Sequence, residues 1–389
     1  MKIFVANTGS ASKKYAFYID ASREIVMHFE HEGGGFVVTF IIDGKEEKRS
    51  ISVNEFHNAT EIALNELLVR KIINNKGEIN AVGFRIVAPG IYFMKNRVVD
   101  GEYMKKLEAA KDEAPLHIGA MLEELANISR ILPNVPVVGI SDSTFHVDIP
   151  ERARFYAIPK ETAETAGIVR YGYHGISFTS ILRKMTATAK IPEKIIICHL
   201  GSGSSIGAVK GGKSADTSMG FTPLEGIPMA TRVGDIDPGA VIYIMKKFGF
   251  GPNELEEYLN THCGLLGLSG QSDDLRTLID AEKAGDKKAA LAIDVLVYKI
   301  KKYIGAYTAA LNGLDALIFS GTIGERSFFL RSRICRDMDG LGVVLDDERN
   351  NNTVSRDGFI QSASSKVKIA VMTTDEMGEI ALETAQILK

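Results

Sequence analysis

Apolar residues near the N-terminus occur in short runs that Gly, Ser and Asp residues separate. The runs at residues 2–6, 15–19 and 36–42 are rich in β-branched and aromatic side chains, a composition that predicts strands. The triplet Gly33-Gly34-Gly35 precedes the third run and predicts a hairpin turn. This part of the chain is therefore expected to begin a sheet.

Helical spacing follows this strand-rich region. Apolar residues recur three or four positions apart over residues 54–74, and Asn54 is a possible N-cap. Buried strands are then predicted at residues 81–88 and 135–140, with a helix at 114–131 between them. Strands in series, followed by alternating helix and strand, predict a mixed sheet with helices packed on it.

A second unit is predicted from about Thr144 onward, and it repeats this order loosely. Strands are expected at residues 195–200, 205–209 and 316–320, and long helices at 238–248, 273–284 and 287–311. Each unit opens with a strand, a Gly/Ser loop and a further strand. This weak internal symmetry predicts a duplicated fold with a ligand bound in the cleft between the halves.

Three Gly/Ser-rich turns carry the small residues that favour anion binding. They follow the apolar runs at residues 3–6, 195–198 and 316–319, in the sequences NTGSASKK, HLGSGSS and SGTIGER. Missing side chains let phosphate oxygens approach backbone N–H groups, and short hydroxyls add donors. We interpret the three turns as holding one anion from several sides, the phosphate chain of a nucleotide.

Two arginines and a histidine are candidates for chemistry at such an anion. Arg85 interrupts an apolar run, where a guanidinium costs free energy unless it binds an anionic ligand or forms an internal salt bridge. Arg232 leaves a similar choice, because Asp235 and Asp237 follow it closely. His174, in the sequence YGYHG, either donates a hydrogen bond to a developing phosphoryl charge or has a structural role.

Two carboxylates are candidates for a metal site. Asp142 and Glu376 each follow a strand-like run, and Mg²⁺ prefers one or two carboxylates together with substrate oxygens. Single acidic residues at strand ends also serve as caps. His117, at a predicted helix start, and His199, before the glycine turn, are ambiguous by themselves. Phosphoryl transfer needs charge neutralisation, a divalent metal and in-line positioning, and these residue types can supply it.

Composition narrows the class of protein. The chain has 389 residues, more than one core usually supports, and its net charge of −3 argues against nucleic acid or a membrane surface as the main partner. The three cysteines lie far apart and match no disulfide framework or metal-ligand spacing. Because the strand pattern starts at once, we expect no export signal and a reducing cytoplasm.

The longest motifs resemble the acetate kinase family, also called acetate and propionate kinases, in the actin-like ATPase superfamily. The most specific part is DTSMGFTPLEG at residues 216–226, which runs on through Thr231-Arg232 to GDIDP at 234–238. The sequence from Asn7 to Tyr15 is similar to the family's N-terminal signature, and RYGYHGIS at 170–177 is similar to its histidine motif. The resemblance covers nearly the whole chain.

The resemblance implies a two-domain α/β actin-like ATPase fold with duplicated ribonuclease H-like mixed sheets flanked by helices. Residues 1–145 plus 378–389 would form an N-terminal domain for the acyl substrate and a phosphate loop, and residues 146–377 a C-terminal nucleotide-binding domain. It also implies a homodimer and reversible phosphoryl transfer between ATP and acetate, giving acetyl phosphate and ADP. The metal would be Mg²⁺, with Mn²⁺ as a possible substitute.

Residue roles carried over from the family fall into four groups. Arg85 and Arg232 would hold the carboxylate and the phosphoryl group, His174 would stabilise the transition state with His117 nearby, and Asp142 would orient an arginine or the metal. Asn7 and Glu376 would place the metal. The pocket for the substrate methyl group would comprise Val87, Leu116, Tyr173 and Pro223. The nucleotide would contact Ser10, Ser12, Lys14, His199, Gly201, Ser202, Gly203, Asp274, Leu275, Arg276, Thr322, Ile323, Gly324 and Arg326.

Some residues depart from the family pattern. Phe84 and the sequence Ala88-Pro89-Gly90 stand where histidine and His-Gly-Gly are usual around the first arginine. Ile118-Gly119 replaces Asn-Pro, and Ser202 replaces an asparagine. In the adenosine loop, Thr322 replaces glycine and Arg326 replaces asparagine. These changes bear on the substrate and the donor more than on the reaction class.

Several alternatives therefore stay open at this point. Propionate or butyrate could replace acetate, since one methylene is worth only ~1–3 kcal/mol of discrimination. Pyrophosphate could replace ATP as the donor. A non-catalytic nucleotide-binding switch would need the loops but neither the two arginines nor the histidine.

Overall fold

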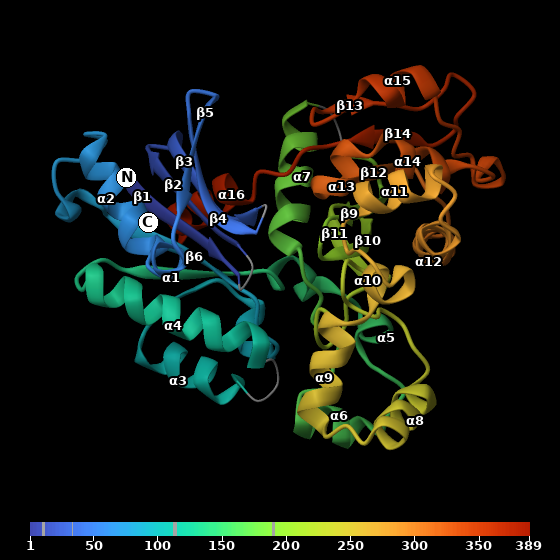
Figure 1. The fold of residues 1–389 in the computed structure, drawn as a ribbon, viewed down its shortest axis with the longest axis horizontal. Helices are drawn as coiled ribbons and strands as arrows, with labels where there is room; N and C mark the ends of the chain where they lie inside the picture. The colour runs from blue at the N-terminus through green and yellow to red at the C-terminus, as the bar shows by residue number, and fades with distance from the viewer. Residues whose placement is uncertain (10–11, 33, 112–114, 189–190) are drawn as a thin grey trace. The chain divides into compact units, whose positions relative to one another are not determined.

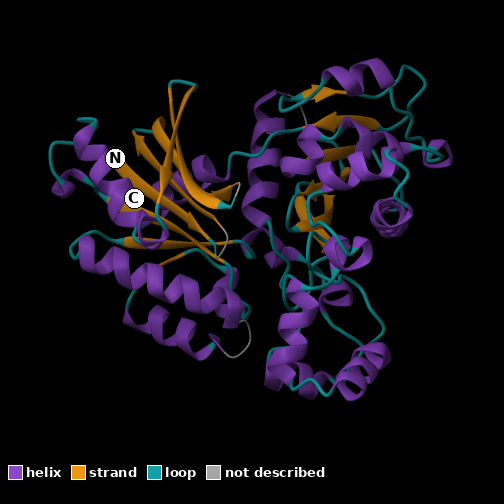
Figure 2. Cartoon of the chain, viewed as in Figure 1, coloured by secondary structure: helices purple, strands orange, loops and turns teal. Residues whose placement is uncertain are grey.

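The computed structural model describes residues 1–9, 12–32, 34–111, 115–188 and 191–389, the side chains of 115–117 and 188 excepted. The chain divides into two compact units, unit 1 with residues Met1–Thr144 and Asp375–Lys389, and unit 2 with Phe145–Thr374. Each unit contains one mixed sheet with helices on it (Figure 1, Figure 2). In the part of the chain described, no helix has both the length and the apolar character that crossing a bilayer requires.

Unit 1 has a sheet that joins a meander of antiparallel strands to two parallel strands and ends with a short antiparallel edge strand. Its sheet has the order β5-β4-β3-β2-β1-β6-β8-β7, in which β6 runs parallel to both β1 and β8. The elements are β1 (Lys2–Thr8), β2 (Ser12–Ile19), β3 (Ser22–Glu32), β4 (Gly35–Ile42), β5 (Lys45–Ile51), α1 (Val53–His57), α2 (Ala59–Val69), β6 (Ala81–Ile86), β7 (Arg97–Val98), α3 (Gly101–Ala109), α4 (Pro115–Ile131), β8 (Val137–Ser141) and α16 (Glu376–Ile387).

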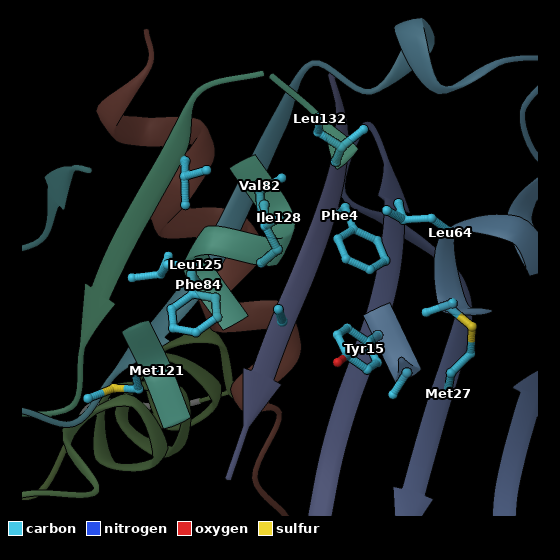
Figure 3. Close-up of a cluster of buried hydrophobic side chains, with 14 of the residues drawn as sticks. Phe4, Tyr15, Met27, Leu64, Val82, Phe84, Met121, Leu125, Ile128 and Leu132 are labelled. Atoms are coloured by element: carbon cyan, nitrogen blue, oxygen red, sulfur yellow. The ribbon is translucent and has the colours of Figure 1, made fainter. Parts of the chain in front are cut away.

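Strand alternation directs successive residues of unit 1 to opposite faces of the sheet. Phe84 of β6 joins the core beneath α4, where Met121, Leu125 and Ile128 pack (Figure 3). The neighbouring Gly83 faces α16, and a Cβ there would collide with side chains of that helix. Arg85 lies two residues after Gly83 in the same strand, so its side chain is on the same face of the sheet as Gly83. The close approach of α16 therefore places an arginine on the helix side of the strand, away from the apolar core.

Unit 2 repeats the arrangement with a shorter sheet. The order is β11-β10-β9-β12-β14-β13, in which β9, β10 and β11 are antiparallel and β12 runs parallel to β9 and β14. The elements are α5 (Glu151–Arg154), α6 (Lys160–Ala166), α7 (Gly175–Thr188), β9 (Lys194–Leu200), β10 (Ser204–Lys210), β11 (Lys213–Thr217), α8 (Pro238–Phe248), α9 (Pro252–Thr261), α10 (Gly264–Ser269), α11 (Leu275–Lys283), α12 (Lys287–Leu311), β12 (Ala316–Ser320), α13 (Gly321–Arg326), α14 (Phe328–Cys335), α15 (Asp347–Asn352), β13 (Gly358–Phe359) and β14 (Lys368–Val371).

Alternation along β9 divides the core of unit 2 between two faces. Ile196 and Cys198 pack with α12, whereas Ile195 and Ile197 pack with Phe178 and its neighbours on α7. Both faces of β9 are thus covered, which explains its unbroken apolar run. The order β3-β2-β1-β6-β8 of unit 1 matches β11-β10-β9-β12-β14 of unit 2, since in each three antiparallel strands continue into two parallel to the third, so the predicted duplication of a mixed sheet is confirmed.

Two predictions about unit 1 were wrong in detail. The single helix expected over residues 54–74 is two helices that meet at Asn58, and Ser52 rather than Asn54 is the N-cap. Ser52 and Glu55 form a reciprocal capping box that starts the helix two residues earlier. The strand β5 was missed because six of its seven residues are exposed, so it lacks the apolar alternation that reveals a strand.

Candidate active site

An ion-pair cluster in unit 1 surrounds Arg85. The guanidinium Nη2 lies 2.7 Å from Asp142 Oδ2, and Nη1 lies 3.1 Å from Asn7 Oδ1 and 3.9 Å from Glu376 Oε2. Asn7 also donates from Nδ2 to Glu376 Oε2 at 3.0 Å. Three strand ends and a helix start supply the four residues: β6 carries Arg85, β1 carries Asn7, Asp142 follows β8, and Glu376 begins α16.

Electrostatics fix the charge state of this cluster. Burial by itself lowers the pKa of Arg85, but the negative charges of Asp142 and Glu376 more than offset it and raise the pKa above the ordinary arginine value. Asp142 has only 1% of its side chain exposed, whereas Arg85 keeps 19%. The internal salt bridge weighed for Arg85 thus forms, closely with Asp142 at Nη2 and more distantly with Glu376 at Nη1, and Asp142 contacts the arginine directly.

A second cluster, in unit 2, surrounds His174. This residue has φ +60°, a left-handed conformation that non-glycine residues rarely adopt and that costs about 1–3 kcal/mol. Its ring Nδ1 lies 2.9 Å from Ser205 Oγ, and the ring packs against that of His199 with centroids 4.4 Å apart. The Ser205 hydroxyl and the His199 ring therefore fix the orientation of the buried His174 imidazole, although its backbone is strained.

Arg232 approaches the same point as His174. A Cβ built on Gly203 would lie 3.5 Å from Arg232 Nη1 and 3.5 Å from His174 Nε2. The two carboxylates weighed as partners for this arginine are engaged elsewhere: Asp235 accepts from Gly226 N and Tyr303 OH, and Asp237 caps α8. Gly203 therefore leaves a small space beside its Cα, and both the Arg232 guanidinium and the His174 Nε2 lie next to that space.

The comparisons with known proteins agree over the whole length. The model of the acetokinase family matches residues 2–382. The chain is 41% identical to an acetate kinase of Bacteroides thetaiotaomicron and 38% identical to one of Bacillus mycoides, over at least 98% of each chain. The chain belongs to the acetokinase family. Solved structures agree: acetate kinase of Porphyromonas gingivalis gives a TM-score of 0.87 at 36% identity with full coverage of both chains, and a propionate kinase of Francisella tularensis gives 0.89 at 33% with 99% coverage.

These neighbours confirm the predicted fold class for this acetokinase, the actin-like α/β arrangement with a duplicated mixed sheet. The third Gly/Ser turn requires a correction. Residues 320–326 do not form an open turn: β12 ends at Ser320, and Gly321–Arg326 is the short helix α13. Thr322 and Arg326 are exposed there, Ile323 is half-buried and Gly324 is buried.

The other expected nucleotide residues lie in two places. In the loop between β9 and β10, Gly201 N donates to Ser204 Oγ at 3.0 Å, and the Ser202 carbonyl accepts from Ala230 N at 3.2 Å. Asp274 caps α11 and accepts hydrogen bonds from the Arg276 guanidinium, so these two exposed side chains bind each other. Leu275 beside them is buried.

The remaining expected residues have mixed outcomes. Ser12 and Lys14 lie on β2, and Lys14 faces Asn7 in the strand register. Ser10 and the side chains of Leu116 and His117 fall outside the described residues. For the methyl pocket, Val87 is half-buried in unit 1, whereas Tyr173 and Pro223 are buried in unit 2.

Sequence reasoning missed Arg331, which holds α13 from beneath. This arginine has no exposed surface, and its guanidinium donates to the carbonyls of Gly324 and Glu325 and to Asn350 and Thr353. Burial without a carboxylate lowers its pKa to about 10. Its position beside Leu330 in a largely apolar helix was the available signal, the same one that singled out Arg85.

Sequence reasoning also missed His146, which is fully buried beneath the histidine motif. Its Nδ1 lies 2.8 Å from Ser214 Oγ and its Nε2 lies 3.0 Å from the Tyr173 carbonyl oxygen. Burial, aided by the positive charges of Arg154 and Arg170, lowers the pKa of His146 to about 4, although the bond to Tyr173 raises it. The ring is therefore neutral at physiological pH.

The lowered pKa of His146 predicts a loss of stability in acid. Between about pH 6.5 and pH 4 the unfolded chain binds a proton at His146 that the folded chain excludes. As the pH decreases through this range, the free energy of unfolding therefore decreases by up to about 1.4 kcal/mol per pH unit. Urea unfolding at pH 7, 6 and 5 should show a shallower decline for His146→Gln than for the unaltered protein. Equal slopes would contradict the expectation.

Proposed function

We propose that the protein is an acetate kinase that transfers the γ-phosphoryl group of ATP reversibly to acetate, giving acetyl phosphate and ADP. The observation that carries the proposal is the approach of Arg232 and His174 to the Cβ position of Gly203, in a chain 41% identical to a curated acetate kinase. Phosphoryl transfer is catalysed mainly by positioning and charge stabilisation, and a fixed cation beside an imidazole N–H donor supplies both.

In this proposal, Arg85 binds the carboxylate of acetate or the phosphate of acetyl phosphate. A guanidinium offers two parallel N–H donors that match a carboxylate or phosphate. Asp142, at 2.7 Å, orients that fork. Of the two roles weighed for Asp142, orienting the arginine is the better supported, because one carboxylate oxygen already accepts from Nη2.

Arg232 and His174 would stabilise the phosphoryl group as it moves. Charge spreads over the equatorial oxygens in the transition state, and donors fixed beforehand need no reorganisation when that charge develops. Ser205 Oγ, bonded to His174 Nδ1, fixes which edge of the ring is offered.

The residues present fit a magnesium ion that binds mainly to phosphate. Across the described ranges no three His, Cys, Asp or Glu side chains form a metal-binding group. Mg²⁺ on nucleotides typically takes one or two carboxylates and keeps water and phosphate ligands. Glu376 would hold the ion, directly or through water, with Asn7 orienting its carboxylate by the 3.0 Å hydrogen bond. The ion would neutralise phosphate charge.

The nucleotide is proposed to bind to unit 2. The loop of Gly201, Ser202 and Gly203 offers backbone donors for phosphate oxygens, with His199 beside it, and Ser12 and Lys14 would complete the phosphate contacts. Asp274, Leu275 and Arg276, with Thr322–Arg326, would contact adenosine. Val87 and Leu116 from unit 1, and Tyr173 and Pro223 from unit 2, would contact the methyl group, and His117 would act near the reacting groups.

An assay with several donors and acceptors tests the proposal. With hydroxylamine as the trap, ATP, Mg²⁺ and acetate should give acetyl hydroxamate, propionate should react less well by about 10-fold, and butyrate less again. Pyrophosphate should not replace ATP. The variant T322G/R326N carries the residues usual in the family and should bind ATP at least as tightly.

Two results of this assay would contradict the proposal. Turnover with pyrophosphate but not with ATP would make pyrophosphate the phosphoryl donor. Thr322 and Arg326 would then explain why ATP does not serve. ATP binding without acyl phosphate from any carboxylate would favour the non-catalytic switch. The retained arginines argue against that alternative, since a switch needs no cation for a carboxylate.

We also propose that the protein acts in the cytoplasm, where its three free thiols would remain reduced.

We further propose that it forms a homodimer through α8. No residue of α8, which the structure describes throughout, is buried, and Ile242, Tyr243 and Phe248 are 50%, 65% and 65% exposed. Exposed large apolar side chains gathered on one helix are typical of an interface between proteins. Sedimentation should show a dimer that Tyr243→Asp dissociates. The control Val69→Asp, at the exposed last residue of α2, should leave the dimer intact. A monomeric unaltered protein would refute the dimer.

A further inference from the structure

We propose that His146 is a positioning residue for His174, acting through the peptide bond between Tyr173 and His174. The inference rests on the proposed function, in which His174 contacts the phosphoryl group. His146 itself lies beneath the histidine motif, fully buried. Its effect on the reaction would be entirely indirect.

The hydrogen bonds of His146 define its role. The Tyr173 carbonyl can only accept, so Nε2, at 3.0 Å, carries the proton and donates. In the neutral ring Nδ1 is then the acceptor, and the Ser214 hydroxyl at 2.8 Å donates to it. The Tyr173 carbonyl therefore selects the tautomer, Ser214 supports it by donating to Nδ1, and the lowered pKa keeps the ring in this neutral form.

The held carbonyl controls the backbone at His174. The oxygen of Tyr173 and the nitrogen of His174 belong to one rigid peptide plane. Rotation of that plane changes the φ angle of His174, which is +60° in a region with little intrinsic stability for histidine. The hydrogen bond from His146 opposes this rotation, so it maintains a conformation that the residue would not favour by itself.

Packing leaves His146 little freedom. Its ring meets those of Phe145 and Phe178 edge to face, with centroids 5.4 Å and 5.6 Å away. On the other side a Cβ at Gly172 would be 2.7 Å from the ring, so the motif backbone approaches the imidazole as closely as only glycine permits. The backbone of Gly172-Tyr173-His174 thus packs directly against the His146 ring.

Movement of the Tyr173–His174 peptide would displace the His174 ring relative to Arg232. The ring is also held by the bond from Nδ1 to Ser205 Oγ and by packing against His199. Both Nε2 of His174 and Nη1 of Arg232 lie 3.5 Å from the Gly203 Cβ position. A shift of about 1 Å at such a site can reduce turnover about 100-fold.

Two amide variants separate the bond to Tyr173 from the bond to Ser214. The amide nitrogen of His146→Gln can occupy the place of Nε2 and donate to the Tyr173 oxygen, whereas His146→Asn reaches only the place of Nδ1. We expect kcat of H146Q within about 3-fold of the unaltered enzyme and kcat of H146N lower by about 10- to 100-fold. KM for ATP and acetate should change less than about 3-fold, because neither substrate contacts residue 146.

A double-mutant cycle distinguishes positioning from a general structural role. In the His174→Ala background, H146N should lower kcat by no more than about 2-fold, because the residue it positions is gone. Equal losses in both backgrounds, or equal losses in H146Q and H146N, would overturn the proposal. If H146N does not fold, Ser214→Ala replaces it, with an expected loss of about 3- to 10-fold that also disappears in the H174A background.

A spectroscopic measurement separates this inference from the proposed function. In protein labelled with ¹⁵N-histidine, the ring resonances of His174, assigned by their loss in H174A, should shift in H146N or S214A and stay in place in H146Q. Unchanged resonances in all variants would refute positioning, whatever the activity. If the unaltered protein makes no acyl phosphate, the proposed function fails while this measurement still decides the role of His146.

Discussion

Arg232→Ala is expected to lower kcat for acetyl phosphate formation by about 10³-fold or more while leaving the fold intact. An arginine that stabilises a transferring phosphoryl group contributes 10³- to 10⁵-fold in related chemistry. Arg232 Nη1 and His174 Nε2 lie equally far from the Gly203 Cβ position, so removal of the guanidinium leaves the imidazole to act without its neighbouring charge. The side chain is half-buried, and its loss should cost little stability.

The measurement compares kcat by hydroxamate assay with the midpoint of urea unfolding. Arg232→Lys keeps the charge but loses the planar fork, so it should recover only part of the rate. Arg336→Ala, an exposed arginine outside both clusters, is the matched control and should retain normal turnover. Near-normal acyl phosphate formation by R232A would remove this arginine from the mechanism.

Changes at Arg85 and Asp142 are expected to affect both stability and activity. Arg85→Met leaves a carboxylate with 1% exposure beside an apolar side chain, and loss of one partner from a buried pair costs about 3–5 kcal/mol. Turnover should also fall about 10³-fold, because the cation proposed to hold the carboxylate is absent. Asp142→Leu should have similar effects, since it removes the carboxylate that orients the guanidinium.

The double variant R85M/D142L separates the two effects. Replacing both partners of a buried ion pair with apolar residues is often neutral for stability, so the unfolding free energy should recover most of the loss seen in either single variant. Turnover should not recover. Recovery of activity with stability would mean that the pair is structural and that carboxylate binding belongs elsewhere.

Patterns within single elements were well predicted from the sequence. The strand at residues 316–320 and the helices at 238–248 and 287–311 occur with the predicted bounds, because apolar periodicity and flanking caps are local properties. The helix expected over 54–74 is instead two helices that meet at Asn58, and Ser52 caps the first of them. β5 failed because an exposed, charged edge strand has no apolar face to reveal it.

The sequence revealed residues of the candidate site where a charged residue interrupts an otherwise apolar run. Arg85 in an apolar strand was such a case; spacing named no acidic partner for it, and the family resemblance offered Asp142 for either an arginine or the metal. Asp142 lies 57 positions away in sequence and meets the guanidinium because β6 and β8 are parallel neighbours. His146 gave no signal at all, since its role depends on a carbonyl 27 residues further along.

The sequence by itself determined several of the strands and helices, the Gly/Ser loop between β9 and β10 and the chemical groups available for phosphoryl transfer. Only the tertiary structure decided which groups meet: the Asp142 partner of Arg85, the bond from His146 to the Tyr173 carbonyl, and the common approach of Arg232 and His174 to Gly203. The reason is physical. Periodicity and capping depend on neighbours along the chain, whereas strand order, helix docking and the left-handed backbone of His174 depend on contacts between distant segments.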